Sequence, residues 1–108
     1  MPLKTYPLGY QDAFNTREDQ ASLLSDALAS GKPEAVAGAL RIIAKARGMT
    51  ETAAAAGLSR EAVYRATGPD GNPTLATLLA ILSSAGLLLS VTPGELRKPR
   101  KPVKKRAA

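Results

Sequence analysis

Apolar residues recur every three or four positions through much of this chain, the spacing that gathers them on one face of an α-helix. The first stripe predicts a helix of about 13 residues that begins at Thr16 and ends at residues 30–32. A second stripe predicts a helix from Pro33 to about Arg47. The two apolar faces consist of Ala21, Leu24, Ala27 and Leu28, and of Val36, Leu40, Ile43 and Ala44.

Small residues dominate the next stretch, and their positions predict two short helices joined by a tight turn. The first helix covers residues 50–56, the turn residues 57–59 and the second helix residues 60–67. This is the layout of a DNA-binding helix-turn-helix over residues 50–67. An ordinary alanine-rich helical hairpin has the same outline, so the layout alone leaves both interpretations open.

Individual positions in this stretch fit the helix-turn-helix pattern. Ala53 is small enough for two helices to cross closely, and Gly57 tolerates the positive φ that the turn requires. Ser59 is a favourable N-cap for the second helix. Leu58 and Val63 are placed to hold the second helix against the first. The fit at all of these positions favours the DNA-binding interpretation.

The last patterned part of the chain is rich in leucine. After a loop of glycine and proline at residues 68–73, Thr74 is expected to cap a helix that ends near Gly86. The segment 87–91 is ambiguous between a short strand and an extension of the helix, and it either pairs with its copy in a dimer or closes the core. The apolar stretch 75–91 is shorter than the roughly 20 residues that span a bilayer, so no membrane segment is expected.

These elements predict an all-α fold, a small helical bundle of about five helices whose last four form a compact unit. Residues 1–15 are expected to form an extended arm because prolines and a glycine oppose helix there. Residues 16–92 form the helical domain. Residues 93–108 form a basic, proline-containing and disordered tail. The 108 residues suffice for one modest core.

The composition argues against an enzyme. The chain contains no cysteine and no histidine, which removes a thiol nucleophile, the commonest general base and the commonest metal ligand. The acids are scattered except Glu18 and Asp19, which point about 100° apart on a helix and suit its first turn. We therefore expect no catalytic residue, metal or cofactor. The first residues lack the apolar core of a signal peptide, so a cytoplasmic location is expected.

The net charge of +6 lies entirely in the tail. Residues 1–93 contain eight basic and eight acidic residues, whereas residues 94–108 contain seven basic residues and one acid. The tail is either a solvated end that aids solubility or a flexible polycation that adds non-specific phosphate contacts, and we favour the second. Those contacts would come from Arg97, Lys98, Arg100, Lys101, Lys104, Lys105 and Arg106.

Because the helical body is neutral, DNA binding depends on where its individual side chains point. Side chains that gather near one side of the second short helix can hydrogen-bond to DNA. With their neighbours they make up the predicted DNA-binding set: Ser59, Arg60, Glu61, Tyr64, Arg65 and Thr50. Arg41, Lys45 and Arg47 of the preceding helix are assigned to a solvated face in preference to phosphate contact.

Four sequence motifs resemble those of one known family. They are ARGM at residues 46–49, GLSRE-x-x-Y-R-A at 57–66, GNPT at 71–74 and GL-x-L-x-V at 86–91. Over residues 12–92 the chain is similar to the addiction-module antidote family, whose members are antitoxins with a lambda-repressor-like (Xre-type) helix-turn-helix. The basic tail lies outside this resemblance.

The resemblance implies a partner and a function. Such antitoxins bind and neutralise a small basic toxin of the RelE/ParE/HigB-like group, and as homodimers they repress their own operon by binding double-stranded DNA at its operator. The DNA-facing residues carried over to this chain are Ser59, Arg60, Tyr64 and Arg65. The toxin-binding surface has no comparable motif. We expect the toxin to bind the helix that begins at Thr16 and the arm before it, because a basic toxin favours the acids Glu18, Asp19 and Asp26.

The expected mechanism places the helices 60–67 of a dimer in successive major grooves, about 34 Å apart. Arg60 can reach a guanine edge with two hydrogen bonds, Tyr64 a phosphate or a thymine methyl, and Arg65 a base or the backbone. Two other functions stay open at this point. One is a stand-alone Xre-type regulator without a toxin, and the other is an interaction module whose helical hairpin is purely structural.

Overall fold

The computed structural model describes residues 15–95, and this part of the chain contains five helices and no strand. The helices are α1 (Arg17–Ser30), α2 (Pro33–Arg47), α3 (Met49–Ala56), α4 (Arg60–Ala66) and α5 (Leu75–Ser84). The prediction of an all-α fold with five helices is confirmed, and each boundary lies close to the expected one. Most of the predicted arm and nearly all of the predicted tail lie outside the described residues.

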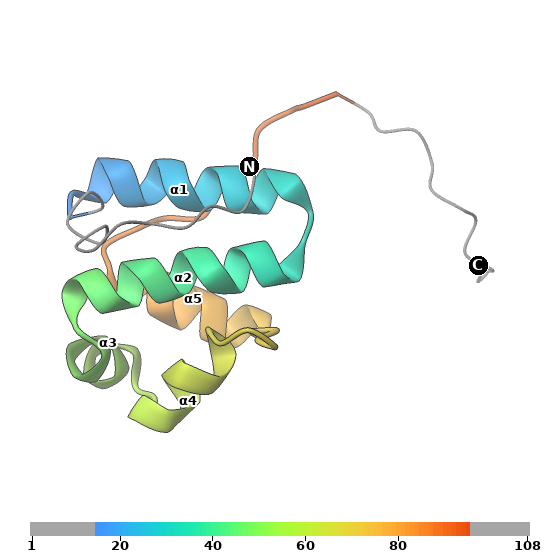
Figure 1. Ribbon diagram of the computed structural model, residues 1–108. Coiled ribbons are helices and arrows are strands. Elements are labelled where there is room, and N and C mark those ends of the chain that lie inside the picture. Colours follow the sequence, from blue (N-terminus) through green and yellow to red (C-terminus); the bar gives the residue numbers. More distant parts are fainter. Residues whose placement is uncertain (1–14, 96–108) are drawn as a thin grey trace.

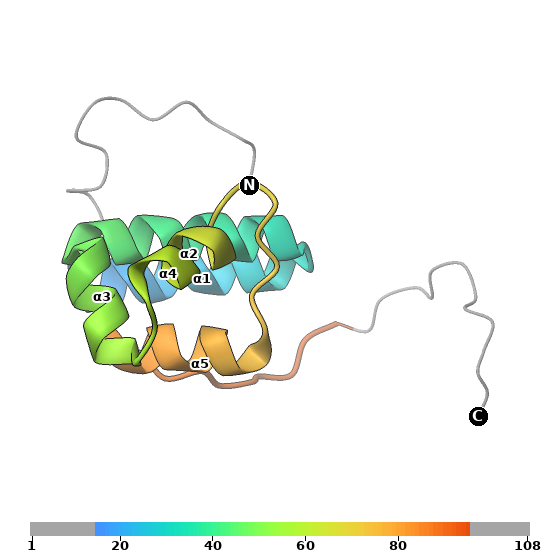
Figure 2. The same cartoon turned by 90° about the horizontal axis from the view of Figure 1, so that it is seen from below.

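The five helices form two adjoining groups. The chain runs along α1 and returns along α2, so these two helices are antiparallel neighbours (Figure 1). α3 and α4 lie on the side of α2 opposite α1, and α5 passes behind α2 in the same view. Seen from below, α4 is close to the viewer and α5 runs along one edge (Figure 2). This arrangement leaves α4 at the periphery of the molecule.

Local hydrogen bonds explain where three of the helices begin. The hydroxyl oxygens of Thr16, Ser59 and Thr74 each accept a bond from the backbone N–H three residues later, at 3.0, 2.9 and 3.1 Å. These bonds satisfy donors that have no partner within the helix. Gly57 ends α3 with a φ of 72°, a conformation that costs other residues more than glycine. The predicted N-caps and the predicted positive φ are therefore confirmed.

Two buried apolar clusters hold the helices together. The first joins α1, α2 and α5 and consists of Leu24, Ala27, Ala39, Leu40, Ile43, Ile81 and Leu82. The second joins the end of α2 to α3 and α4 and consists of Ala44, Met49, Ala53 and Val63. Leu58, in the turn between α3 and α4, packs against both clusters. The compact unit expected of the last four helices also includes α1, whose Leu24 and Ala27 belong to the first cluster.

Two polar contacts tie α2 to its neighbours. The buried hydroxyl of Thr52 in α3 donates to the carbonyl of Ala44 in α2 at 3.3 Å. The guanidinium of Arg47, at the end of α2, donates to the carbonyl of Ser84, at the end of α5. Carbonyl groups at helix ends lack partners within their own helix, so the second bond satisfies one of them. The first contact fixes α3 against α2, and the second fixes the end of α5 against the end of α2.

The segment after α5 forms neither a strand nor an extension of the helix, and Leu87 at its start packs against the first cluster. Gly86 has a φ of 75°, and the N–H of Leu87 donates to the carbonyl of Leu82 at 2.9 Å, which turns the chain out of the helix. Residues 88–95 then follow an open path without helix or strand. Of the helices within residues 15–95, none combines the length and apolar character that crossing a bilayer demands.

Candidate nucleic-acid interface

α4 is anchored through one of its sides. Val63 is fully buried, at 0% exposure, against Ala44, Met49 and Ala53. At the end of the helix, the buried hydroxyl of Thr67 donates to the carbonyl of Val63 at 2.7 Å, which closes the last turn. The packing that secures the helix therefore leaves its opposite side available to solvent.

The predicted DNA-binding residues of the body are mostly on the solvent side. Those with exposed side chains are Ser59, Arg60, Glu61 and Arg65 around α4, and Thr50 in the first turn of α3. Tyr64 is half-buried and packs against the second cluster. Exposure meets the steric condition for entering a groove, and the DNA contacts themselves stay predictions.

Tyr64 contacts two arginines. The guanidinium carbon of Arg60 is 5.2 Å from the centroid of its ring, and that of Arg41 is 5.0 Å away. Arg60 Nη2 also donates to the Tyr64 hydroxyl at 3.4 Å, and Arg41 Nη1 donates to the Tyr64 carbonyl at 3.3 Å. The negative face of an aromatic ring attracts cations at such distances. The contacts therefore orient Arg60 on the exposed side of α4 and bring a further cation, Arg41, to the helix.

The assignment of Arg41 to a solvated face is wrong. Arg41 is half-buried, because its guanidinium lies against the ring and the carbonyl of Tyr64 in α4. Lys45 is exposed, as expected. Arg47 is also exposed, but its guanidinium is bonded to α5. Arg41 was not predicted as a residue of the site, because no local pattern in the sequence contains a signal for it.

Replacing Arg41 with alanine is expected to lower the free energy of unfolding by about 1–2 kcal/mol, since both the cation–π contact and a charged hydrogen bond are lost. Urea denaturation followed by circular dichroism measures the change. Lys45→Ala, one turn further along α2, is the control and is expected to change stability by less than about 0.5 kcal/mol. Equal destabilisation by the two substitutions would show that the contact with Tyr64 contributes little.

Other predicted residues stand outside this arrangement. The basic tail residues, from Arg97 to Arg106, lie outside the described part of the chain. The acids proposed for toxin binding, Glu18, Asp19 and Asp26, are all exposed on α1. Within residues 15–95, no group of three side chains suited to a metal ion occurs.

Comparison with known proteins identifies relatives of the chain. A family model described as "Probable addiction module antidote protein" matches residues 4–93. An uncharacterized protein of Haemophilus influenzae is 38% identical over 77 residues, which cover 70% of this chain and 79% of that protein. No solved structure gives a significant match. The matched range includes the whole of the helical body and excludes most of the basic tail.

Proposed function

The chain belongs to the family of probable addiction module antidote proteins, and from that premise we propose that it is the antitoxin of a two-gene toxin–antitoxin module. It neutralises a small basic toxin of the RelE/ParE/HigB-like group by binding it directly. It also represses its own operon by binding operator DNA as a dimer. Both activities take place in the cytoplasm and use no cofactor or metal.

The observation that carries the DNA-binding half of this proposal is the exposed side of α4. A short helix that is anchored through Val63 and presents Arg60 and Arg65 to solvent is suited to the major groove. α3 and α4 then act as an Xre-type helix-turn-helix with α4 as the recognition helix. Arg60 binds a guanine edge, Arg65 a base or a phosphate, and Tyr64 a phosphate or a thymine methyl.

The toxin-binding half rests on the family and on the charge of α1. Glu18, Asp19 and Asp26 give this exposed helix an acidic surface, and opposite charges favour the encounter with a basic toxin. α1 lies on the side of α2 away from α3 and α4 (Figure 1). The two activities therefore use different surfaces of one small domain.

Two measurements test the proposal together. A gel-shift assay uses a duplex from upstream of the gene, with a scrambled duplex as control, because the tail is expected to bind any DNA weakly. Co-expression with the neighbouring gene tests whether its product co-purifies. We expect selective DNA binding and a stable complex. DNA binding without a complex would support a stand-alone regulator. If neither DNA binding nor a complex is observed, the chain is an interaction module whose helical hairpin is purely structural.

Removing residues 94–108 is expected to weaken binding to operator and scrambled DNA alike. The segment contains seven of the 15 basic residues, and each phosphate contact that is lost reduces the number of counterions released on binding. The measurement is the slope of log affinity against log salt concentration, which should become shallower. A slope unaltered by the truncation would show that the tail does not touch DNA.

A further inference from the structure

Arg41 is a partly buried cation that is paired with an aromatic residue instead of an acid. It lies on α2, outside the proposed helix-turn-helix, and its side chain is half-buried, whereas Lys45 one turn further along is exposed. Within residues 15–95 Arg41 forms no ion pair, and its hydrogen bond and its ring contact are both with Tyr64. A charge that leaves water needs compensation from its surroundings, and here Tyr64 supplies it.

The end of α4 offers Arg41 a carbonyl group that the helix itself does not use. The N–H of Gly68 donates to the carbonyl of Arg65 at 3.4 Å, and in the described part of the chain no backbone N–H donates to the carbonyl of Tyr64. Arg41 Nη1 donates to that carbonyl at 3.3 Å. Carbonyl groups at the C-terminal end of a helix favour a positive charge, so the bond fixes Arg41 to the backbone of α4.

Glycine at position 68 keeps this approach open. A Cβ at Gly68 would lie 3.1 Å from the carbonyl oxygen of Tyr64 and 3.7 Å from Arg41 Nη1. The first distance is tighter than an ordinary van der Waals contact, so a side chain there would crowd the hydrogen bond. The loop after α4 therefore leaves room for a cation that comes from α2.

The ring of Tyr64 connects Arg41 to Arg60. Both guanidinium groups contact this ring, at 5.0 and 5.2 Å from its centroid, and Arg60 Nη2 also donates to the hydroxyl at 3.4 Å. A tyrosine side chain has only two rotatable bonds, so a contact that fixes its ring fixes its hydroxyl as well. The orientation of the ring in turn determines where the guanidinium of Arg60 lies on the exposed side of α4.

We propose that Arg41 is a positioning residue for operator recognition: it holds the ring of Tyr64, and through this ring it holds the guanidinium of Arg60 that reads the DNA. The inference rests on the proposed function and adds to it a residue from outside the helix-turn-helix. Arg41 itself does not touch DNA, because its half-buried guanidinium is engaged by the ring and the carbonyl. It favours operator binding by reducing the conformational freedom that Arg60 loses in the complex.

A double-mutant cycle on DNA binding tests the connection. Arg41→Met removes the charge and both contacts, and it is expected to reduce the ratio of operator to scrambled-DNA affinity by roughly tenfold. Combined with Arg60→Ala, it should reduce the ratio no further than Arg60→Ala alone. Lys45→Met removes the same charge one turn along α2 and should keep the ratio of the wild type. Losses that add in the double variant, or an equal loss in Lys45→Met, overturn the proposal.

The salt dependence of binding separates positioning from phosphate contact. A side chain that neutralises one phosphate changes the slope of log affinity against log salt concentration by about 0.9. Arg41→Met should therefore keep the slope of the wild type on the operator duplex, and a slope shallower by about 0.9 would overturn the proposal. The titrations are made at a temperature at which circular dichroism shows every variant folded, so that the expected loss of stability does not alter the affinity.

A measurement without DNA tests the positioning directly. An aromatic ring shifts the NMR signals of protons close to it, so the Nε–Hε signal of Arg60 reports its contact with Tyr64. In Arg41→Met this signal should move toward that of the exposed Arg65, and in Lys45→Met it should stay in place. An unchanged Arg60 signal in Arg41→Met overturns the proposal. A wild-type protein without preference for the operator contradicts the proposed repression, and the Arg60 signal then decides whether Arg41 positions that side chain.

Discussion

Replacing Arg60 with alanine is expected to weaken binding to the operator by about 1–3 kcal/mol and to leave binding to scrambled DNA nearly unchanged. The guanidinium is exposed, and its contacts with Tyr64 hold it in one orientation on α4. A pre-oriented guanidinium loses less conformational freedom when it forms two hydrogen bonds to guanine. The loss should therefore appear as reduced discrimination between sequences, measured by titrating both duplexes at one salt concentration.

Two further variants separate the possible causes of that loss. Arg60→Lys keeps the charge and removes the planar fork, so it should leave binding to scrambled DNA unchanged and should not restore selectivity for the operator. Lys32→Ala removes one positive charge from the exposed turn between α1 and α2 and should leave selectivity intact. An Arg60→Ala variant that loses the same affinity for both duplexes would instead assign Arg60 to phosphate contact.

Helix positions were predictable because the residues that start and stop them act locally. Thr16, Ser59 and Thr74 cap helices through bonds that span only three residues, and Gly57 supplies the turn by itself. The close crossing of α3 and α4 also follows from local facts, namely a small residue at Ala53 and apolar residues on the facing sides. The exposed set around α4 could be predicted because Val63 fixes which side of that helix is buried.

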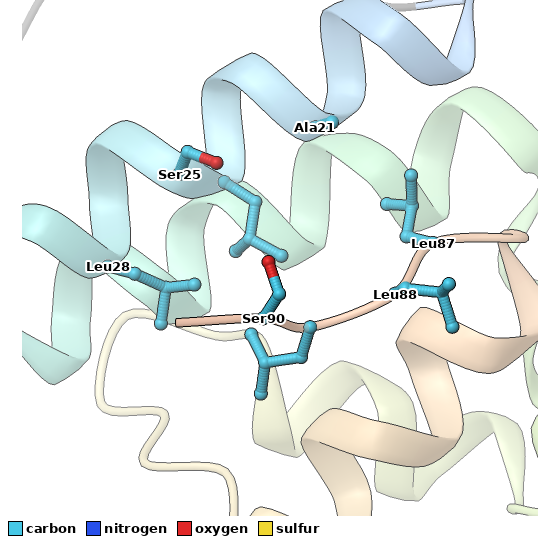
Figure 3. A pocket seen from close by; sticks show the side chains of 8 residues that line it. Ala21, Ser25, Leu28, Leu87, Leu88 and Ser90 are labelled. Carbon is cyan, nitrogen blue, oxygen red and sulfur yellow. The ribbon is translucent and has the colours of Figure 1, made fainter. Parts of the chain in front are cut away.

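Contacts between distant parts of the chain were not predictable in the same way. Arg41 and Tyr64 are 23 residues apart, and they meet only because the fold brings this part of α2 beside α4. Helical periodicity assigns Arg41 to solvent, since the pattern within α2 contains no information about α4. The segment 87–91 is too short to show a period, so the sequence pattern does not reveal that it runs beside α1, with which it lines a pocket (Figure 3).

Tyr64 illustrates how the fold limits a predicted role. The spacing along α4 places it among the DNA-facing residues, and the structure buries half of it against the second cluster. The guanidinium groups of Arg41 and Arg60 both lie within 5.2 Å of its ring centroid, so the ring already takes part in two contacts inside the protein. Tyr64 therefore acts both as a packing residue for α4 and as a support for the orientation of Arg60.

Replacing Leu40 with alanine is expected to lower the free energy of unfolding by about 2–5 kcal/mol. Leu40 is 0% exposed and belongs to the cluster that joins α1, α2 and α5, so the shorter side chain leaves a cavity among three helices. Chemical denaturation measures the loss. Leu40→Met nearly conserves the volume and should cost less than about 1.5 kcal/mol, which makes it the matched control.

The same substitution also tests whether the two clusters act separately. α4 is held by the second cluster, through Val63, Ala44 and Ala53, and Leu40 is not a member of that cluster. Well below its unfolding temperature, the Leu40→Ala protein should therefore bind operator DNA with the affinity of the wild type, because the orientation of α4 is preserved in every folded molecule. A loss of selectivity that parallels the loss of stability would mean instead that the packing of α1 and α5 on α2 determines how α4 is presented to DNA.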